Sequence, residues 1–371
     1  MKLKNNFLIP LAVCLAISIA GCGVKNASPL SISSEKSSQR ILFVSNQDGN
    51  REIYTVLLDG SSLERLTHNT RDDYEASWSP DGKAILFTSN RDNGNSEIYV
   101  MNADGSQQTN LSKWKGFDGQ PAWSPDGQHI VFVSDRSGPM QLYSINKDGR
   151  NLHQLTTDEI QSCDSPVYSP DGKMLAYRKL NERAKGDLWV LNLSDMRHRQ
   201  LTNNPGYEDS PPRWSPDGQS LVYDSRRERQ YNIYRYDLQT NKESQLTHLH
   251  TSDIQPVWSN SGEYISFLST RGPHGRTQLY IMREDGSDQT SITDGLSQVD
   301  NPTWFSDESR MLLVSWQGNW YSNVYVVDLE SGALRIVVPA KGYQSQPLPE
   351  PVLLPLSHMQ STRQVASNRL Q

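Results

Sequence analysis

The chain has 371 residues, a formal net charge of −6 and a hydrophobic content of 35%. Without the first 21 residues, which contain Lys2 and Lys4 and no acid, the net charge is −8. This composition excludes a disordered chain and a non-specific binder of nucleic acid, so we expect no nucleic-acid partner.

The N-terminus has the pattern of an export leader. A basic start precedes an apolar run over residues 7–20, which is too short and too interrupted to span a membrane comfortably. The run ends in Ile19-Ala20-Gly21-Cys22, which resembles the bacterial lipobox, where the cysteine is lipidated and becomes the mature N-terminus. We therefore predict a lipoprotein signal peptide over 1–21, a lipid on Cys22 and a flexible tether over 22–40. The alternative is a plain secretory leader with an incidental cysteine.

The residue after this cysteine bears on the destination. It is Gly23, not the aspartate that tends to hold members of the lipoprotein family at the inner membrane. The resemblance therefore implies a lipid-anchored protein of the cell envelope. In a cell with two membranes it implies the outer membrane, facing the periplasm.

Short strand-like runs then alternate with turn signals. Residues 41–45 and 53–56 read as strands joined by a hairpin over 46–51, and Leu66-Thr67 closes a third run. The turn Trp78-Ser79-Pro80-Asp81-Gly82 follows, and the same order of runs then repeats along the chain.

This aromatic-led turn is the repeat that organises the sequence. Its six copies are 45, 45, 46, 44 and 46 residues apart. The leading aromatics are Trp78, Trp123, Tyr168, Trp214, Trp258 and Trp304. The pentapeptide itself forms a turn, since proline presets φ, aspartate tolerates the next position and glycine relieves the last. A period of this length carried by short strands is typical of propeller blades, so the motif indicates architecture and not chemistry.

The number of blades follows from counting strands. There are seven outer three-strand units but only six internal copies of the inner strand. Residues 342–347 resemble residues 116–121, the lead-in to the second copy. We predict that 343–356 completes the first blade, which gives seven four-stranded blades closed by both ends of the chain. Six blades is the alternative, and residues 357–371 are expected to be a disordered tail.

The whole repeat is similar to a known family. The order Asp-x-x-Pro-x-Trp-Ser-Pro-Asp-Gly, apolar strand, Ser-x-Arg, Ile-Tyr, Asp-Gly and Leu-Thr resembles the TolB-type propeller repeat over residues 41–356. The resemblance implies an all-β propeller, and it implies little about activity, because such propellers serve as binding scaffolds, enzymes and accessory domains. TolB carries an extra N-terminal domain for which residues 23–40 are too short, so we expect the likeness in the propeller only.

Acidic residues recur in the segments that lead into the inner strands. Aligning these segments places an acid near the channel mouth in six blades: Asp73, Asp118, Asp164, Asp209, Asp253 and Asp300. Arginines recur in the facing hairpins at positions 91, 136, 227 and 271. Each acid could pair with such an arginine. Alternatively, the ring could attract calcium, another divalent cation or a basic partner segment.

Aromatic residues break the repeat on the same face, where propellers tend to bind. Trp114 lies in a lead-in loop, and Trp316 and Trp320 lie in the last blade's hairpin. These residues are candidate anchors for a peptide or stacking platforms for sugars, and packing between blades is the alternative.

Catalysis has weaker support in the sequence. His68, His248 and His250 follow Leu-Thr units on this face, and polygalacturonate-cleaving lyases with similar repeats hold a metal with histidine clusters. The three belong to blades far apart and no fourth ligand is evident, so we assign no catalytic or metal residues. Lone Cys163 is expected to be a buried structural thiol.

These observations favour a monomeric, lipid-anchored envelope protein. Its propeller is expected to bind a protein or peptide partner at the channel mouth, with the anchor contacting the membrane. The alternative is a carbohydrate-binding protein or a metal-dependent polysaccharide lyase that uses the same face.

Overall fold

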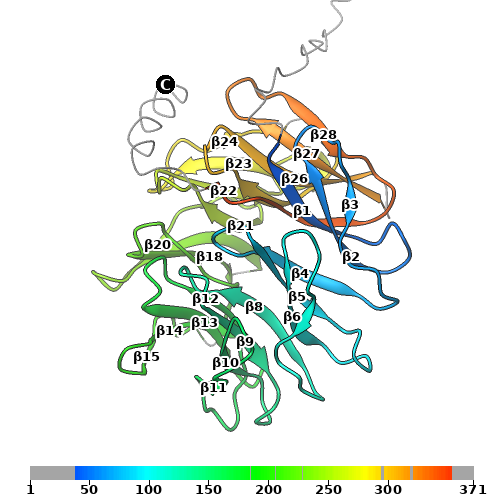
Figure 1. The fold of residues 1–371 in the computed structure, drawn as a ribbon. Coiled ribbons are helices and arrows are strands. Elements are labelled where there is room, and N and C mark those ends of the chain that lie inside the picture. Colours follow the sequence, from blue (N-terminus) through cyan, green and yellow to red (C-terminus); the bar gives the residue numbers. More distant parts are fainter. Residues whose placement is uncertain are drawn as a thin grey trace, which may run out of the picture. The chain divides into compact units, whose positions relative to one another are not determined.

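The computed structural model describes residues 38–352 except 184, 205, 228, 294–295 and 318–320. In this part of the chain, 29 strands form seven antiparallel sheets with a single short 3₁₀ turn (η1, Pro273–Gly275) (Figure 1). The prediction of an all-β propeller with seven blades is confirmed. The predicted leader, Cys22, most of the tether and the tail lie outside the described residues.

The first four blades contain the following strands. Blade 1 has β29 (Gln344–Pro349), β1 (Arg40–Ser45), β2 (Glu52–Leu57) and β3 (Glu64–Arg65). Blade 2 has β4 (Asp73–Trp78), β5 (Ala84–Ser89), β6 (Glu97–Asn102) and β7 (Thr109–Asn110). Blade 3 has β8 (Asp118–Trp123), β9 (His129–Ser134), β10 (Gln141–Asn146) and β11 (His153–Gln154). Blade 4 has β12 (Cys163–Tyr168), β13 (Met174–Leu180), β14 (Gly186–Asn192) and β15 (Arg197–Gln200).

The last three blades follow in the same order, from the innermost strand outward. Blade 5 has β16 (Glu208–Asp209), β17 (Arg213–Trp214), β18 (Ser220–Arg227), β19 (Gln230–Asp237) and β20 (Lys242–Gln245). Blade 6 has β21 (Asp253–Trp258), β22 (Tyr264–Ser269), β23 (Gln278–Arg283) and β24 (Thr290–Ser291). Blade 7 has β25 (Val299–Trp304), β26 (Arg310–Gln317), β27 (Tyr321–Asp328) and β28 (Leu334–Val338).

The two ends of the described chain close the ring. Strand β29 pairs antiparallel with β1, so that Val44 lies opposite Ser345. Beyond the strand, the guanidinium of Arg40 forms an ion pair of 2.7 Å with Glu350. The three-plus-one closure of blade 1 is thus confirmed, and the observed strand lies inside the predicted range 343–356.

The aromatic-led turns are held by their own side chains. In the first copy, Ser79 Oγ donates to Asp81 Oδ1 at 2.7 Å and accepts from the backbone N–H of Ala84 at 2.9 Å. Gly82 has a φ of +68°, which a residue with a Cβ adopts only with strain. Asp126, Asp171 and Asp217 accept the same serine bond in their copies. The motif is therefore a closed turn, as its sequence indicates.

The Leu-Thr pairs also have a structural role. The hydroxyl of Thr247, which is fully buried, accepts the backbone N–H of Ile233 at 3.0 Å. The same bond recurs in blades 1 to 6, where the acceptors are Thr67, Ser112, Thr156, Thr202, Thr247 and Thr293. A buried N–H without such an acceptor would cost stability, so this residue type recurs.

The apolar core lies in the seams between neighbouring blades. Trp78 and Phe87 of blade 2 pack in one cluster with Val44 and Ile53 of blade 1. Val324 and Val326 of blade 7 pack with blade 1 in the same way, which closes the core around the ring. Each blade is therefore stabilised by its two neighbours.

Candidate functional site

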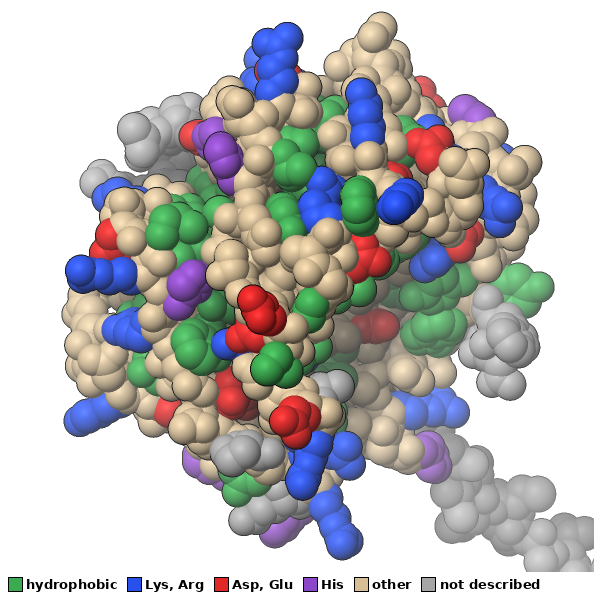
Figure 2. Space-filling model, turned by 90° about the horizontal axis from the view of Figure 1, so that it is seen from below, with side chains coloured by type: hydrophobic (Ala, Val, Ile, Leu, Met, Phe, Trp, Pro, Cys, Tyr) green, Lys and Arg blue, Asp and Glu red, His purple; other side chains and the backbone are tan. Residues whose placement is uncertain are grey.

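The connections between strands make two faces of the propeller. The loop face carries the loops that lead into the innermost strands and the hairpins between the second and third strands. Contacts join these two kinds of segment: Arg51 forms an ion pair of 3.0 Å with Asp72, and the indole Nε1 of Trp114 donates to Asp135 at 2.7 Å. The turn face carries the aromatic-led turns, which contact one another: a Cβ on Gly127 would lie 3.4 Å from Pro80. On the face seen in Figure 2, basic and acidic side chains are interspersed.

Strand register divides the six predicted acids into two sets. Asp73, Asp118, Asp209 and Asp253 each lie opposite a serine of the second strand. The same position is held by other residues in the remaining blades, namely Cys163, Val299 and Gln344. Asp164 and Asp300 come one residue later. The acids therefore do not form one ring of equivalent positions.

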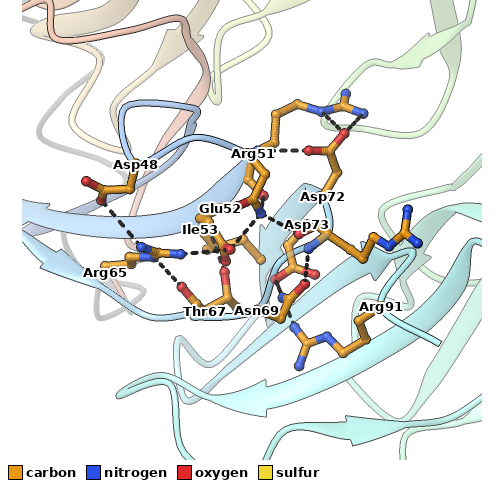
Figure 3. A network of polar contacts seen from close by, with 12 residues as sticks. Asp48, Arg51, Glu52, Ile53, Arg65, Thr67, Asn69, Asp72, Asp73 and Arg91 are labelled. Atoms are coloured by element: carbon orange, nitrogen blue, oxygen red, sulfur yellow. Dashed lines mark hydrogen bonds and ion pairs between the residues drawn. The ribbon is translucent and has the colours of Figure 1, made fainter. Parts of the chain in front are cut away.

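The first set of acids is buried, and three of the four pair with the predicted arginines. Arg91 bonds Asp73 at 2.8 Å, Arg136 bonds Asp118 at 2.7 Å and Arg271 bonds Asp253 at 2.8 Å. The four carboxylates are between 0% and 1% exposed. Figure 3 shows one such network at the junction of blades 1 and 2, where Asn69 also donates to Asp73 at 2.6 Å. Buried and paired in this way, these carboxylates offer little surface to a partner.

Asp209 is the exception in this set. Ser225 donates to its Oδ1 at 2.5 Å, whereas Arg227 turns to Glu243 with two bonds of 2.7 Å. Burial raises the pKa of Asp209, and it also raises the pKa of Asp118. Within the described chain, Oδ2 of Asp209 is buried and has no hydrogen-bond partner, as is also true of one oxygen of each of the other three acids.

The second set of acids belongs to a polar belt along the innermost strands. Asp164 accepts two bonds of 2.7 Å from Arg178, and Asp300 accepts the amide of Gln255 at 2.9 Å.

Other bonds of the belt tie a blade to the next through the backbone. The N–H of Gln120 donates to Glu75 at 2.8 Å, and that of Ser165 donates to Gln120 at 2.7 Å. Glu75 has a φ of +56° at a bulge in β4, which directs its side chain to this bond. These bonds connect adjacent blades and so stabilise the ring. They occupy part of the hydrogen-bonding capacity of the carboxylates and amides in the belt.

The belt is irregular at blade 5. The innermost strand is split into β16 and β17 by Ser210, Pro211 and Pro212. Proline has no backbone N–H, so it cannot donate to a ladder or to the preceding blade. Asp224 of β18 takes part in its place, since it accepts the hydroxyl of Ser210 at 2.5 Å and the N–H of Gln255 at 2.9 Å.

The predicted aromatic anchors already make contacts within the protein. Trp114 is half-buried, and its ring lies beneath the guanidinium of Arg136 at 5.3 Å. Trp316 is half-buried against Tyr343, with ring centroids 5.1 Å apart. Trp320 lies outside the described residues. The two described indoles thus combine packing with partial exposure on the loop face.

Three apolar side chains on this face are more exposed. Ile160, Tyr207 and Leu249 are 80%, 36% and 51% exposed, and they lie in the lead-in loops of blades 4, 5 and 6. We call these three residues the apolar arc. Ile160 and Leu249 were not singled out from the sequence. Their signal is a large aliphatic residue inside an otherwise polar lead-in loop.

The three candidate histidines do not form a metal site among the described residues. His68, His248 and His250 are exposed. Among residues 38–352, apart from the gaps given above, no group of three His, Cys, Asp or Glu side chains is arranged to hold a metal ion. Cys163 is buried, and burial raises its pKa to about 11.

No helix in the described residues is long and apolar enough to cross a membrane. The chain folds as a seven-bladed propeller. The side chains that differ between blades and are accessible to a partner lie on the loop face, whereas the first set of acids is buried.

The comparison with protein families identifies the class. The family model described as "TolB beta propeller domain" matches residues 91–164 and 146–348, more than half of the chain. The chain belongs to this family.

Two proteins that this chain is similar to have names that point to different roles. The Tol-Pal system protein TolB of Desulfosudis oleivorans is 40% identical over 52 residues, which are 14% of this chain and 12% of that protein. The uncharacterized peptidase YuxL of Bacillus subtilis is 34% identical over 85 residues, 23% of this chain and 13% of that protein. The matched stretches thus span about an eighth of either relative.

Solved structures share the fold at low identity. TolB from Acinetobacter baumannii has a TM-score of 0.54 at 18% identity, with 85% of this chain and 68% of that chain covered. An oligogalacturonate lyase from Vibrio parahaemolyticus has a TM-score of 0.61 at 14% identity, with 81% and 85% covered. Such identities show the fold alone. Family membership therefore leaves both binding and catalysis open.

Proposed function

We propose that this chain is an envelope lipoprotein, anchored through Cys22, whose propeller binds a protein or peptide partner with its loop face. The observation that carries the proposal is the apolar arc: three neighbouring lead-in loops each expose a large apolar side chain on one face. Clustered exposed apolar groups with a polar rim are typical of protein-binding surfaces. Trp114 and Trp316 extend the same face with two partly exposed indoles.

The buried acids have a supporting role in this proposal. Because Asp73, Asp118 and Asp253 are paired inside the blades, they hold the hairpins and lead-in loops together. A rigid platform lowers the entropy that a partner must remove on binding. Charge reversal of these acids would unfold the platform, so it does not test binding.

The test uses exposed residues instead. The full-length lipidated protein, solubilised in detergent, is cross-linked to envelope extract and compared with the double variant Ile160→Asp with Leu249→Asp. The matched control is Leu63→Asp, because Leu63 is 42% exposed between the third and fourth strands of blade 1, toward the turn face.

The expected result is a partner that wild type and Leu63→Asp retain and the double variant loses, with all melting temperatures equal. If the double variant retains every partner of wild type, the apolar arc is not the binding surface. If wild type captures no partner at all, the carbohydrate-binding alternative gains support.

A further inference from the structure

The seams between blades share one arrangement, with local departures. In six of the seven seams, the aromatic that leads the turn of one blade lies on an innermost strand that contacts the third strand of the blade before it, and Pro349 holds this position in the seam between blades 7 and 1. Trp123 packs with Val100, and Trp304 packs with Ile281. At the seam between blades 5 and 6, the guanidinium of Arg235 lies 5.6 Å above the ring of Trp258. A bulky residue and an indole thus fill the seam.

The seam between blades 3 and 4 has smaller residues at both positions. Tyr168 replaces the tryptophan, and Ser144 stands where Val100, Val190 and Ile281 stand in other blades. Blade 1 also has a small residue there, Thr55, but it is followed by the tryptophan Trp78, so only this seam combines a small residue with a tyrosine. A hollow of about 700 Å³ opens there, on the turn face. This volume lies within the range of about 300–1,000 Å³ that is typical of ligand sites.

The lining of the hollow combines one aromatic ring with many hydrogen-bonding groups. Tyr168 and Met196 supply apolar surface, and His129 and His153 supply ring nitrogens at the rim. Both imidazoles are exposed, so they can reach a ligand. The amide of Gln154 also lines the hollow, but its Nε2 already donates to the carbonyl of Thr156 at 2.8 Å and to Ser137 at 3.1 Å.

Two turn carboxylates complete the lining. Asp126 and Asp171 each use Oδ1 for the serine and backbone bonds of their turns, which leaves Oδ2 to accept from a ligand. The serine hydrogen bond is the largest effect that lowers the pKa of each, so both are ionised at neutral pH. Oδ2 of Asp171 lies 3.6 Å from Lys173 Nζ on the surface, a weak interaction.

We propose that this hollow between blades 3 and 4 binds a short neutral oligosaccharide. Sugar rings have apolar faces that pack on an aromatic ring and hydroxyls that donate to carboxylates and accept from imidazoles. The two carboxylates disfavour an acidic sugar through repulsion. The site is on the face opposite the apolar arc, so it stands independently of the proposed function.

The test measures binding of neutral trisaccharides to the full chain. Chitotriose, maltotriose and cellotriose are titrated by calorimetry, with saturation-transfer NMR as a second readout and a trigalacturonate as the acidic comparison. At least one neutral trisaccharide is expected to bind with a millimolar or lower Kd, and the acidic one more weakly. Wild-type protein that binds none of the three overturns the proposal.

Variants locate the site. The double variant Tyr168→Trp with Ser144→Val gives this seam the same two side chains as the seam between blades 2 and 3. It therefore fills the hollow with a combination that already packs elsewhere in the ring. Binding is expected to weaken by roughly tenfold or more. Thr55→Val is the matched control, since Thr55 is the buried counterpart of Ser144 in blade 1. This control is expected to bind as wild type does.

A surface variant keeps the test decisive if the double variant folds poorly. His153→Ala removes an exposed rim side chain. It is expected to weaken binding severalfold with an unchanged melting temperature. If neither variant weakens binding, or if Thr55→Val abolishes it, the oligosaccharide binds elsewhere and the proposal is overturned.

Discussion

Asp209 and Asp253 occupy the same position in two blades, but they differ in one partner. Asp253 accepts a bond of 2.8 Å from Arg271, whereas Arg227 of the other blade bonds Glu243. Asp209 is left with the hydroxyl of Ser225. Each carboxylate has one buried oxygen without a partner among the described residues, Oδ2 in Asp209 and Oδ1 in Asp253, so the two acids differ in the ion pair. A buried charge without a cation is costly, so the two acids should respond in opposite ways to neutralisation.

We predict that Asp253→Asn lowers the free energy of unfolding by about 2–3 kcal/mol, because it leaves Arg271 buried without its anion. Asp209→Asn is expected to raise it by about 1 kcal/mol at pH 7, because the amide keeps an acceptor for Ser225 and removes a buried charge. Urea unfolding at pH 7 measures both. Asp148→Asn, in an exposed pair with Arg150, serves as the control near zero.

The pH dependence of the Asp209 effect has a definite sign. Burial raises the folded-state pKa of Asp209 above its ordinary value of 3.8, so the folded protein binds the proton more tightly. The stability this provides is present below pH 3.8 and is lost as the pH rises through the folded pKa. The advantage of Asp209→Asn should therefore shrink on acidification. An advantage that grows toward pH 4 would contradict the assignment.

Residue positions were the least predictable part of the candidate site. The six acids were aligned by their chemical type, but the aromatic that ends each inner strand sets the register. The position five residues before Tyr168 is Cys163, and the position five before Trp304 is Val299. Asp164 and Asp300 therefore point to the polar belt and not to the arginine pocket. Burial of the other acids depends on packing across blades, which the repeat alone does not reveal.

At the scale of the element, strand β29 has the largest consequence. It supplies the innermost strand of blade 1, its backbone at Leu348 accepts the indole N–H of Trp78 at 3.3 Å, and Gln346 donates to Asn301 of blade 7 at 3.0 Å. One six-residue strand thus contacts blades 1, 2 and 7. This element could be predicted because the repeat contains seven outer three-strand units and only six inner strands, so one inner strand had to come from the C-terminal end. The split inner strand of blade 5 was not predicted, although Pro211 and Pro212 are visible in the sequence.

We predict that truncation after Lys341 abolishes the single cooperative unfolding transition. Without β29, strand β1 presents an open edge with unpaired backbone groups and the apolar seam to blade 2 is exposed. The truncated chain should melt at a lower temperature and associate in size-exclusion chromatography. A chain that ends at Val352 keeps all of β29 and serves as the control. Equal melting temperatures and two monomers would show that the C-terminal strand does not close the ring.

At the scale of the whole molecule, the two faces should act independently. The apolar arc lies in the lead-in loops of blades 4 to 6, and the hollow lies at the turns of blades 3 and 4. An innermost strand of six residues, such as β12, separates the two faces by about 20 Å. The core lies in separate seams, so no single apolar cluster of the described residues spans the ring.

We therefore predict that Ile160→Asp with Leu249→Asp leaves oligosaccharide affinity unchanged within about twofold, because distant sites without shared partners are nearly additive. Likewise, Tyr168→Trp with Ser144→Val should leave partner capture by the loop face intact. Titration calorimetry and cross-linking on both double variants and their combination measure the coupling. If the loop-face variant changes the affinity for the trisaccharide tenfold, the two faces are coupled. Binding at one face would then alter the packing of the other, which means that the blades move together.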